Sequence, residues 1–208
     1  MNTNTINGKN IGSNLIIALT FYSPIIITTS ILILSLFSGA IGKGLFFIFW
    51  ILVITALRIF IMWLIPNNSV TPSYMNPVCN TGNFLPYDNV TYSIFILCFS
   101  FFYFATPMFI LNNINYLVVL FFIVYIVFDI FVKMSNRCVL SFRTMFGDII
   151  GGGGLGALIA TLIYSSPIRS YLFINEISSN KQVCSMSSKQ QFKCAVYKNG
   201  ELIGSSVR

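Results

Sequence analysis

The sequence predicts an all-α membrane protein, a bundle of four to five transmembrane helices followed by a small C-terminal extramembrane domain that contains a β-hairpin. Two observations predict this class. The chain of 208 residues is 56% hydrophobic and only 8% charged, whereas a soluble domain carries roughly 25% charged residues. The apolar residues also gather in long blocks, and about 20 such residues are what a helix needs to cross a bilayer.

Five apolar blocks make up the expected transmembrane bundle, which covers residues 15–164 and follows a polar N-terminal segment, residues 1–14. The expected spans are residues 15–37, 45–65, 90–111, 116–132 and 149–164, with a polar loop at 66–89. The last block is near the lower length limit for crossing and begins with glycines, which disfavour helix. A full crossing is favoured there over a re-entrant segment.

The segment 165–208 is polar and forms the expected C-terminal domain. Its Asn199-Gly200 pair, between two short apolar runs, predicts a β-hairpin turn. Cys184 and Cys194 precede or enter this hairpin, and a disulfide between them would help so small a domain to fold. In a reducing compartment they would instead be two thiols or a metal-binding pair.

Two signals disagree on orientation. The positive-inside rule favours an inside N-terminus, because one side then holds four basic residues, Lys9, Lys133, Arg137 and Arg143. The other side then holds Lys43 and the start of the C-terminal segment. Against this, the glycosylation sequons that begin at Asn67 and Asn89 lie in the loop that this orientation places inside.

Three charged residues fall within or beside the expected spans, namely Arg58, Asp129 and Asp148. Charges in the membrane are costly and point to a function by default. One interpretation is that the carboxylates only reach the interface, with Asp129 pairing locally with Lys133 four residues later. Another is that Arg58 pairs with Asp129 or Asp148 from a different helix, and a third is that the three residues serve a small channel or transporter.

A cluster of glycines opens the last apolar block, at Gly151, Gly152, Gly153, Gly154 and Gly156. Small residues let membrane helices approach closely, so helix packing is the favoured interpretation. A hinge and a phosphate-binding loop are the alternatives. The loop is disfavoured because no Gly-Lys-Ser/Thr sequence follows.

The residues needed for catalysis are scarce. The chain has no histidine, no Cys-x-x-Cys pair and five scattered acidic residues, so neither a catalytic triad nor a two-metal site is expected. We therefore expect no enzyme activity, no catalytic residue, no cofactor and no metal. The net charge of +7 is interpreted as contact with lipid headgroups and not with nucleic acid.

Two stretches carry a family resemblance. The first is Thr20–Ser30, TFYSPIIITTS, and the second lies in the C-terminal segment, which contains FINEISSNK, CSM and FKCAVYKNGE between Phe173 and Glu201. Together they resemble a group of multi-span membrane proteins encoded by nucleocytoplasmic large DNA viruses, the giant viruses of algae and protists. The resemblance covers most of the chain and includes no catalytic motif.

The resemblance implies a structural or anchoring protein of the virion inner membrane, present in host membranes during assembly. The C-terminal segment would link this membrane to capsid proteins. The lipid bilayer is the first expected partner, and capsid proteins or further copies of the chain are the others. The alternative function is the small channel or transporter that would use Arg58, Asp129 and Asp148.

Overall fold

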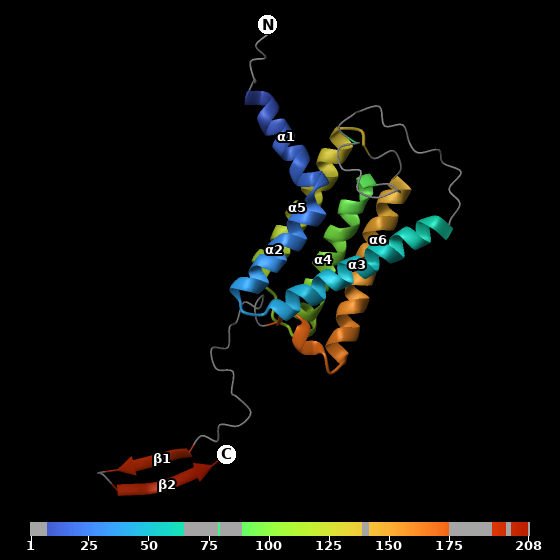
Figure 1. Ribbon diagram of the computed structural model, residues 1–208. Helices are drawn as coiled ribbons and strands as arrows, with labels where there is room; N and C mark the ends of the chain where they lie inside the picture. Colours follow the sequence, from blue (N-terminus) through green and yellow to red (C-terminus); the bar gives the residue numbers. More distant parts are fainter. Residues whose placement is uncertain are drawn as a thin grey trace.

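The computed structural model describes residues 8–64, 79, 89–138, 142–174, 193–198 and 201–207. Six helices follow one another, α1 (Gly8–Phe21), α2 (Ser23–Phe37), α3 (Ile41–Leu64), α4 (Asn89–Ile110), α5 (Tyr116–Ser135) and α6 (Phe142–Ser165) (Figure 1). Four of them, α3 to α6, are long and apolar enough to cross a membrane, and the pair α1–α2 would make a fifth span. The predicted multi-pass helical bundle is confirmed at this level.

The first apolar block, predicted as one span at residues 15–37, is a bent pair of helices, which is either a broken span or a re-entrant segment. The axes of α1 and α2 differ by 76°, and the break lies at Tyr22, just before Pro24 near the start of α2. Proline lacks an N–H, and its ring collides with the preceding turn. Thr28 and Thr29 donate to the carbonyls of Pro24 and Ile25, both at 2.8 Å, and so bond within α2 instead of bridging the break.

A tight turn joins α2 to α3. Gly39 has a φ of +68°, a conformation that suits glycine. The Ser35 hydroxyl donates to the Ala40 carbonyl at 2.6 Å and accepts from the Gly44 amide at 2.9 Å. Because Ser35 holds this turn together, α3 begins at Ile41, four residues before the predicted start.

Helix α4 occupies the centre of the bundle and packs most closely against α6. A Cβ atom on Gly152 or Gly156 would lie 2.3 Å or 2.4 Å from the carbonyl oxygen of Phe95 or Phe99 in α4. One on Gly153 would lie 2.9 Å from the Phe102 ring. These three glycines therefore set the distance between the two helices.

Helix α6 begins at Phe142, seven residues before the predicted start of the last span. Its 24 residues make a helix about 36 Å long at 1.5 Å per residue, enough to cross a hydrocarbon core of about 30 Å. The first turns of this helix contain polar residues, so the hydropathy of the sequence did not include them in the predicted span. Arg143 is exposed there, and Asp148 is buried against another helix.

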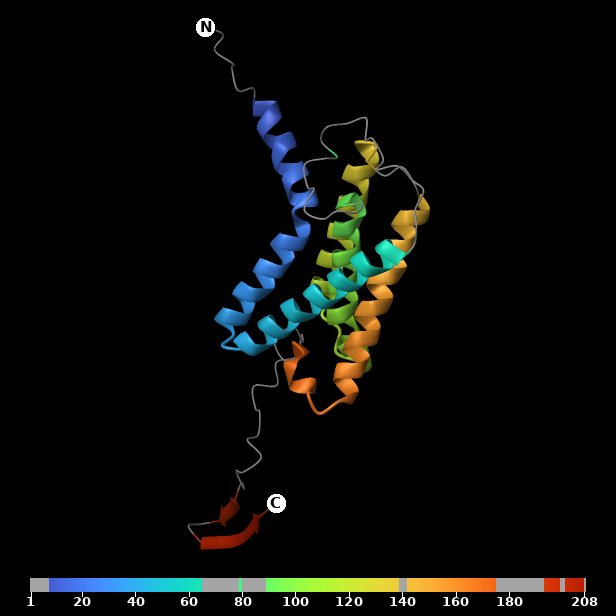
Figure 2. The same ribbon diagram turned by 45° about the vertical axis from the view of Figure 1, so that its right-hand side comes forward.

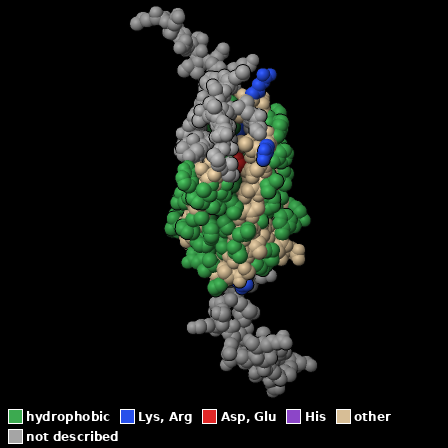
Figure 3. Space-filling model, turned by 90° about the vertical axis from the view of Figure 1, so that its right-hand side faces the viewer, with side chains coloured by type: hydrophobic (Ala, Val, Ile, Leu, Met, Phe, Trp, Pro, Cys, Tyr) green, Lys and Arg blue, Asp and Glu red, His purple; other side chains and the backbone are tan. Residues whose placement is uncertain are grey.

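The two ends of the bundle differ (Figure 2). The α5–α6 connection lies at the end from which α1 projects, and the α2–α3 turn and the short 3₁₀ helix η2 (Arg169–Tyr171) lie at the other. On the face in Figure 3, apolar side chains form a band between these ends, and Lys and Arg side chains appear near both. This distribution is typical of a chain that crosses a bilayer.

The final elements are β1 (Lys193–Lys198) and β2 (Glu201–Val207), which pair antiparallel with an irregularity between Val196 and Tyr197. The folded C-terminal domain that the sequence predicts remains a prediction.

Candidate functional site: two buried ion pairs beside helix α4

Four charged side chains gather near the end of the bundle that holds the α5–α6 connection. Arg58, Asp129 and Asp148 each lie six residues from the end of their helix that faces this connection, a depth of about 9 Å at 1.5 Å per residue. Lys133 is one turn nearer the surface on α5. With Thr91 and Ser93 from the first turns of α4, these residues form what we call the charged cluster.

The first ion pair joins α3 to α6. Arg58 donates from Nε to Asp148 Oδ1 and from a terminal nitrogen to Oδ2, each at 3.1 Å. The same nitrogen donates to Thr91 Oγ1 at 3.3 Å. The guanidinium carbon also lies 5.6 Å from the ring centre of Tyr92 and 5.7 Å from that of Phe95. Because Arg58 contacts both carboxylate oxygens, the ion pair also fixes the relative orientation of the two side chains.

The second ion pair lies within α5 and is completed by α4. Lys133 donates to Asp129 Oδ2 at 2.7 Å and also contacts the hydroxyl of Ser93. Ser93 in turn donates to Asp129 Oδ2 at 2.9 Å. The other carboxylate oxygen, Asp129 Oδ1, is buried and has no hydrogen-bond partner among the described residues.

Burial corrects one interpretation of the sequence. Asp129 and Lys133 are 0% exposed, and Arg58 and Asp148 are 5% and 6% exposed. None of the four side chains is exposed enough to be solvated by headgroups or water, and each is paired with an opposite charge within the bundle. The sequence allows Asp129 or Asp148 as the partner of Arg58, and in the structure Arg58 pairs with Asp148.

A disulfide covers this end of the bundle, and it joins cysteines that the sequence analysis did not pair. Cys79 is bonded to Cys138, and the bridge packs with Phe21 of α1 and Val90 of α4. The Phe21 ring centre lies 5.5 Å from Lys133 Nζ. The bridge therefore closes an apolar layer above the charged cluster.

The sequence did contain a signal for this bridge. Both cysteines occur in polar connections, and the two predicted spans between them, residues 90–111 and 116–132, place these connections on the same side of the membrane. The predicted pair is not tested by the structure. Cys184 lies outside the described residues, and nothing is described of the Cys194 side chain within β1.

No protein-family model, curated protein or solved structure matches the chain.

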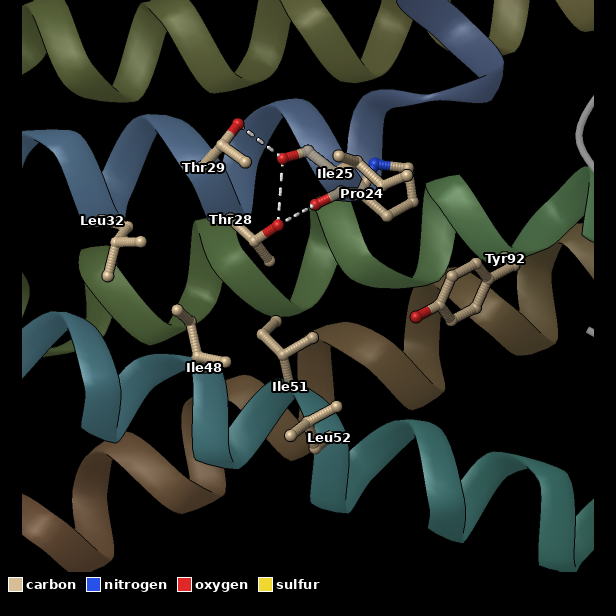
Figure 4. A pocket seen from close by; sticks show the side chains of 9 residues that line it. All are labelled: Pro24, Ile25, Thr28, Thr29, Leu32, Ile48, Ile51, Leu52 and Tyr92. Atoms are coloured by element: carbon tan, nitrogen blue, oxygen red, sulfur yellow. Dashed lines mark hydrogen bonds between the residues drawn. The ribbon is translucent and has the colours of Figure 1, made fainter. Parts of the chain in front are cut away.

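A cavity of about 350 Å³ lies between α2 and α3 (Figure 4). Apolar side chains dominate its wall, and the Thr28 and Thr29 hydroxyls are bonded to carbonyls of their own helix. Tyr92 lines one end, with its hydroxyl 2.9 Å from Thr55 Oγ1. None of the charged side chains of the cluster lines this cavity, so it offers no polar route to them.

Within the described parts of the chain, no three histidine, cysteine or acidic side chains come together in an arrangement that would hold a metal ion.

The remaining predicted glycines differ from the three at the α4 contact. A Cβ on Gly151 would make an ordinary contact of 3.7 Å with the Phe95 ring, and one on Gly154 would meet nothing within 4 Å.

Removing the disulfide is expected to destabilise this end of the bundle. The variant Cys138→Ser should lower the free energy of unfolding by about 2 kcal/mol, the lower part of the range for disulfides, because the bilayer already restricts the unfolded chain. Thermal unfolding in a mild detergent, with and without reductant, measures this. Reductant should lower the midpoint of the wild-type protein and leave that of the variant unchanged; equal effects on both would contradict the assignment.

Proposed function

We propose that this chain is a structural membrane protein whose two buried ion pairs hold a helical bundle in one arrangement, and which anchors other components to the membrane through its basic C-terminal segment. The observation that carries the proposal is the pairing of all four charges of the cluster inside the protein. Charges that are already satisfied by one another are suited to fixing helix positions.

The ion pairs contribute specificity more than net stability. Burying a charge costs several kcal/mol, which an opposite charge largely offsets. A wrong arrangement of α3 and α6 would leave Arg58 or Asp148 buried without a partner, however, and that costs about 3–5 kcal/mol. The cluster thus excludes alternative packings of helices whose surfaces are otherwise mostly apolar.

The membrane in which this protein functions is suggested by the resemblance to membrane proteins of large DNA viruses. In this proposal the bundle lies in the inner membrane of a virion. The segment 165–208 carries six basic and two acidic residues, and this excess favours contact with an acidic face of a capsid protein or with anionic headgroups.

Fractionation of purified virus particles tests the location. The protein should remain with washed particles and be released together with lipid by a mild detergent. A protein that is found in infected-cell membranes but not in particles would contradict the virion assignment.

Neutralising the C-terminal segment tests its role. The combined variant replaces four lysines with glutamine, namely Lys181, Lys189, Lys193 and Lys198. Each lysine near an anionic surface contributes about 1 kcal/mol to attraction, so the variant should be incorporated into particles far less than the wild type. A matched control replaces Lys9 and Arg143, which lie at the other end of the bundle. Equal incorporation of both variants would contradict docking through this segment.

A second candidate, a small proton-conducting channel or transporter, is favoured by one observation. Asp129 Oδ1 is buried without a hydrogen-bond partner among the described residues, and acidic residues within membrane spans often belong to proton relays. This candidate predicts a proton flux across reconstituted vesicles that is lost in the variant Asp129→Asn.

A further inference from the structure

We infer that the end of the bundle with the Cys79–Cys138 bridge faces an oxidising compartment and that the C-terminal segment lies on the opposite, reducing side of the membrane. This reverses the orientation that the charges of the sequence favour. It is independent of the proposed function, because it depends only on the disulfide, on α6 and on the positions of the basic residues.

The disulfide gives the first argument. Stable protein disulfides form in the endoplasmic reticulum, outside cells and in the periplasm, and they are rare in the cytosol. Cys79 and Cys138 are both about 1% exposed, and the bridge is enclosed by Phe21 and Val90, as in a permanent structural bond. The end of the bundle that carries it therefore belongs to an oxidising compartment.

Helix α6 places the C-terminal segment on the side of the membrane opposite the bridge. It begins four residues after Cys138 and ends at Ser165, and its 24 residues are sufficient for one crossing. One crossing separates the bridge from everything that follows Ser165. With the bent pair α1–α2 counted as one span, the N-terminus lies on the same side as the bridge.

The structure also removes the charge bias that favoured the other orientation. The positive-inside rule concerns basic residues in loops near the spans. Lys133 is a buried residue of α5 paired with Asp129 and not a loop residue. Three basic residues then remain on the disulfide side, Lys9, Arg137 and Arg143, against three within about 20 residues of a span on the other side, Lys43, Arg169 and Lys181.

The distribution of basic residues therefore no longer conflicts with an oxidising compartment on the side of the disulfide. The sequon at Asn67 belongs to the connection that carries Cys79, and the one at Asn89 begins helix α4 at the same end of the bundle, on the side where glycosylation takes place. In the inferred orientation Cys184 and Cys194 lie in a reducing compartment, so they are thiols and not a disulfide. The acidic surface that the C-terminal segment contacts must then be on that same side.

Glycosylation tags test the orientation with the full chain. The native sequons are removed by Asn67→Gln and Asn89→Gln, and a Gly/Ser-rich extension with one Asn-Ser-Thr acceptor is added either before Met1 or after Arg208. Both proteins are synthesised with endoplasmic reticulum microsomes. We expect a glycosidase-sensitive mass increase for the N-terminal extension alone. Modification of the C-terminal extension, of both or of neither would overturn the inference.

Thiol labelling gives an independent measurement on the same microsomes. A membrane-impermeant maleimide added outside the vesicles, without reductant, should label the protein, and the double variant Cys184→Ser/Cys194→Ser should lose the label. Labelling only after reduction or after detergent would overturn the inference. The triple variant Cys138→Ser/Cys184→Ser/Cys194→Ser is the matched control, since its Cys79 thiol faces the lumen and should be labelled only when detergent is present.

Discussion

Replacing Arg58 by leucine is expected to lower the free energy of unfolding of the bundle by about 3–5 kcal/mol, the cost of leaving one member of a buried ion pair without its partner. Arg58 is 5% exposed and holds both oxygens of Asp148. Its removal leaves a buried carboxylate between α3 and α6, and Thr91 also loses a donor. Thermal unfolding of the purified protein in a mild detergent measures the change.

Two further variants make this result specific to the ion pair. Arg143 is an exposed arginine of α6, so Arg143→Leu should change the free energy of unfolding by less than about 0.5 kcal/mol, as for an ordinary surface site. The double variant Arg58→Leu/Asp148→Leu removes both charges and should regain most of the stability that Arg58→Leu loses. If the double variant were as unstable as the sum of its single changes, the two residues would not form a pair.

The second large effect concerns the contact between α4 and α6. The variant Gly152→Ala should destabilise the bundle by up to about 3 kcal/mol, as overpacking does, because its Cβ would lie 2.3 Å from the backbone oxygen of Phe95. A backbone atom cannot rotate away as a flexible side chain can. The two helices must separate, and the ion pair that joins α3 to α6 must adjust with them.

Gly154 provides the matched control on the same helix. A Cβ at this position meets nothing within 4 Å, and alanine is favoured over glycine in a helix by about 1 kcal/mol. Gly154→Ala should therefore raise the unfolding midpoint in the same detergent assay, whereas Gly152→Ala lowers it. A rise for both variants would show that the close contact between α4 and α6 does not limit packing.

Hydropathy was sufficient to predict a helical membrane protein, because a run of about 20 apolar residues has few other stable environments. It was less informative at the ends of helices. The polar first turns of α6, with Arg143 and Asp148, resemble a loop, and the break at Tyr22 depends on how Pro24 is accommodated by its neighbours. Both are decided by tertiary contacts that a linear pattern does not contain.

The partners of charged residues were also beyond the sequence. Lys133 and Asp129 are four residues apart, and their pairing follows from helix geometry alone. Arg58 had two candidate partners on other helices, and only the packing of α3 against α4 and α6 distinguishes them. The hydroxyls of Thr91 and Ser93 carried no separate signal, because serine and threonine occur throughout the apolar blocks.

The central claim is that the charges within the membrane hold the bundle together and do not conduct. Proton flux across reconstituted vesicles tests it most directly, with a pH-sensitive dye inside, an imposed pH gradient and a potassium ionophore to prevent charge build-up. The account predicts that vesicles with the wild-type protein are as tight as protein-free vesicles. A flux that depends on the amount of protein and is abolished in Asp129→Asn would contradict the structural role and support the channel.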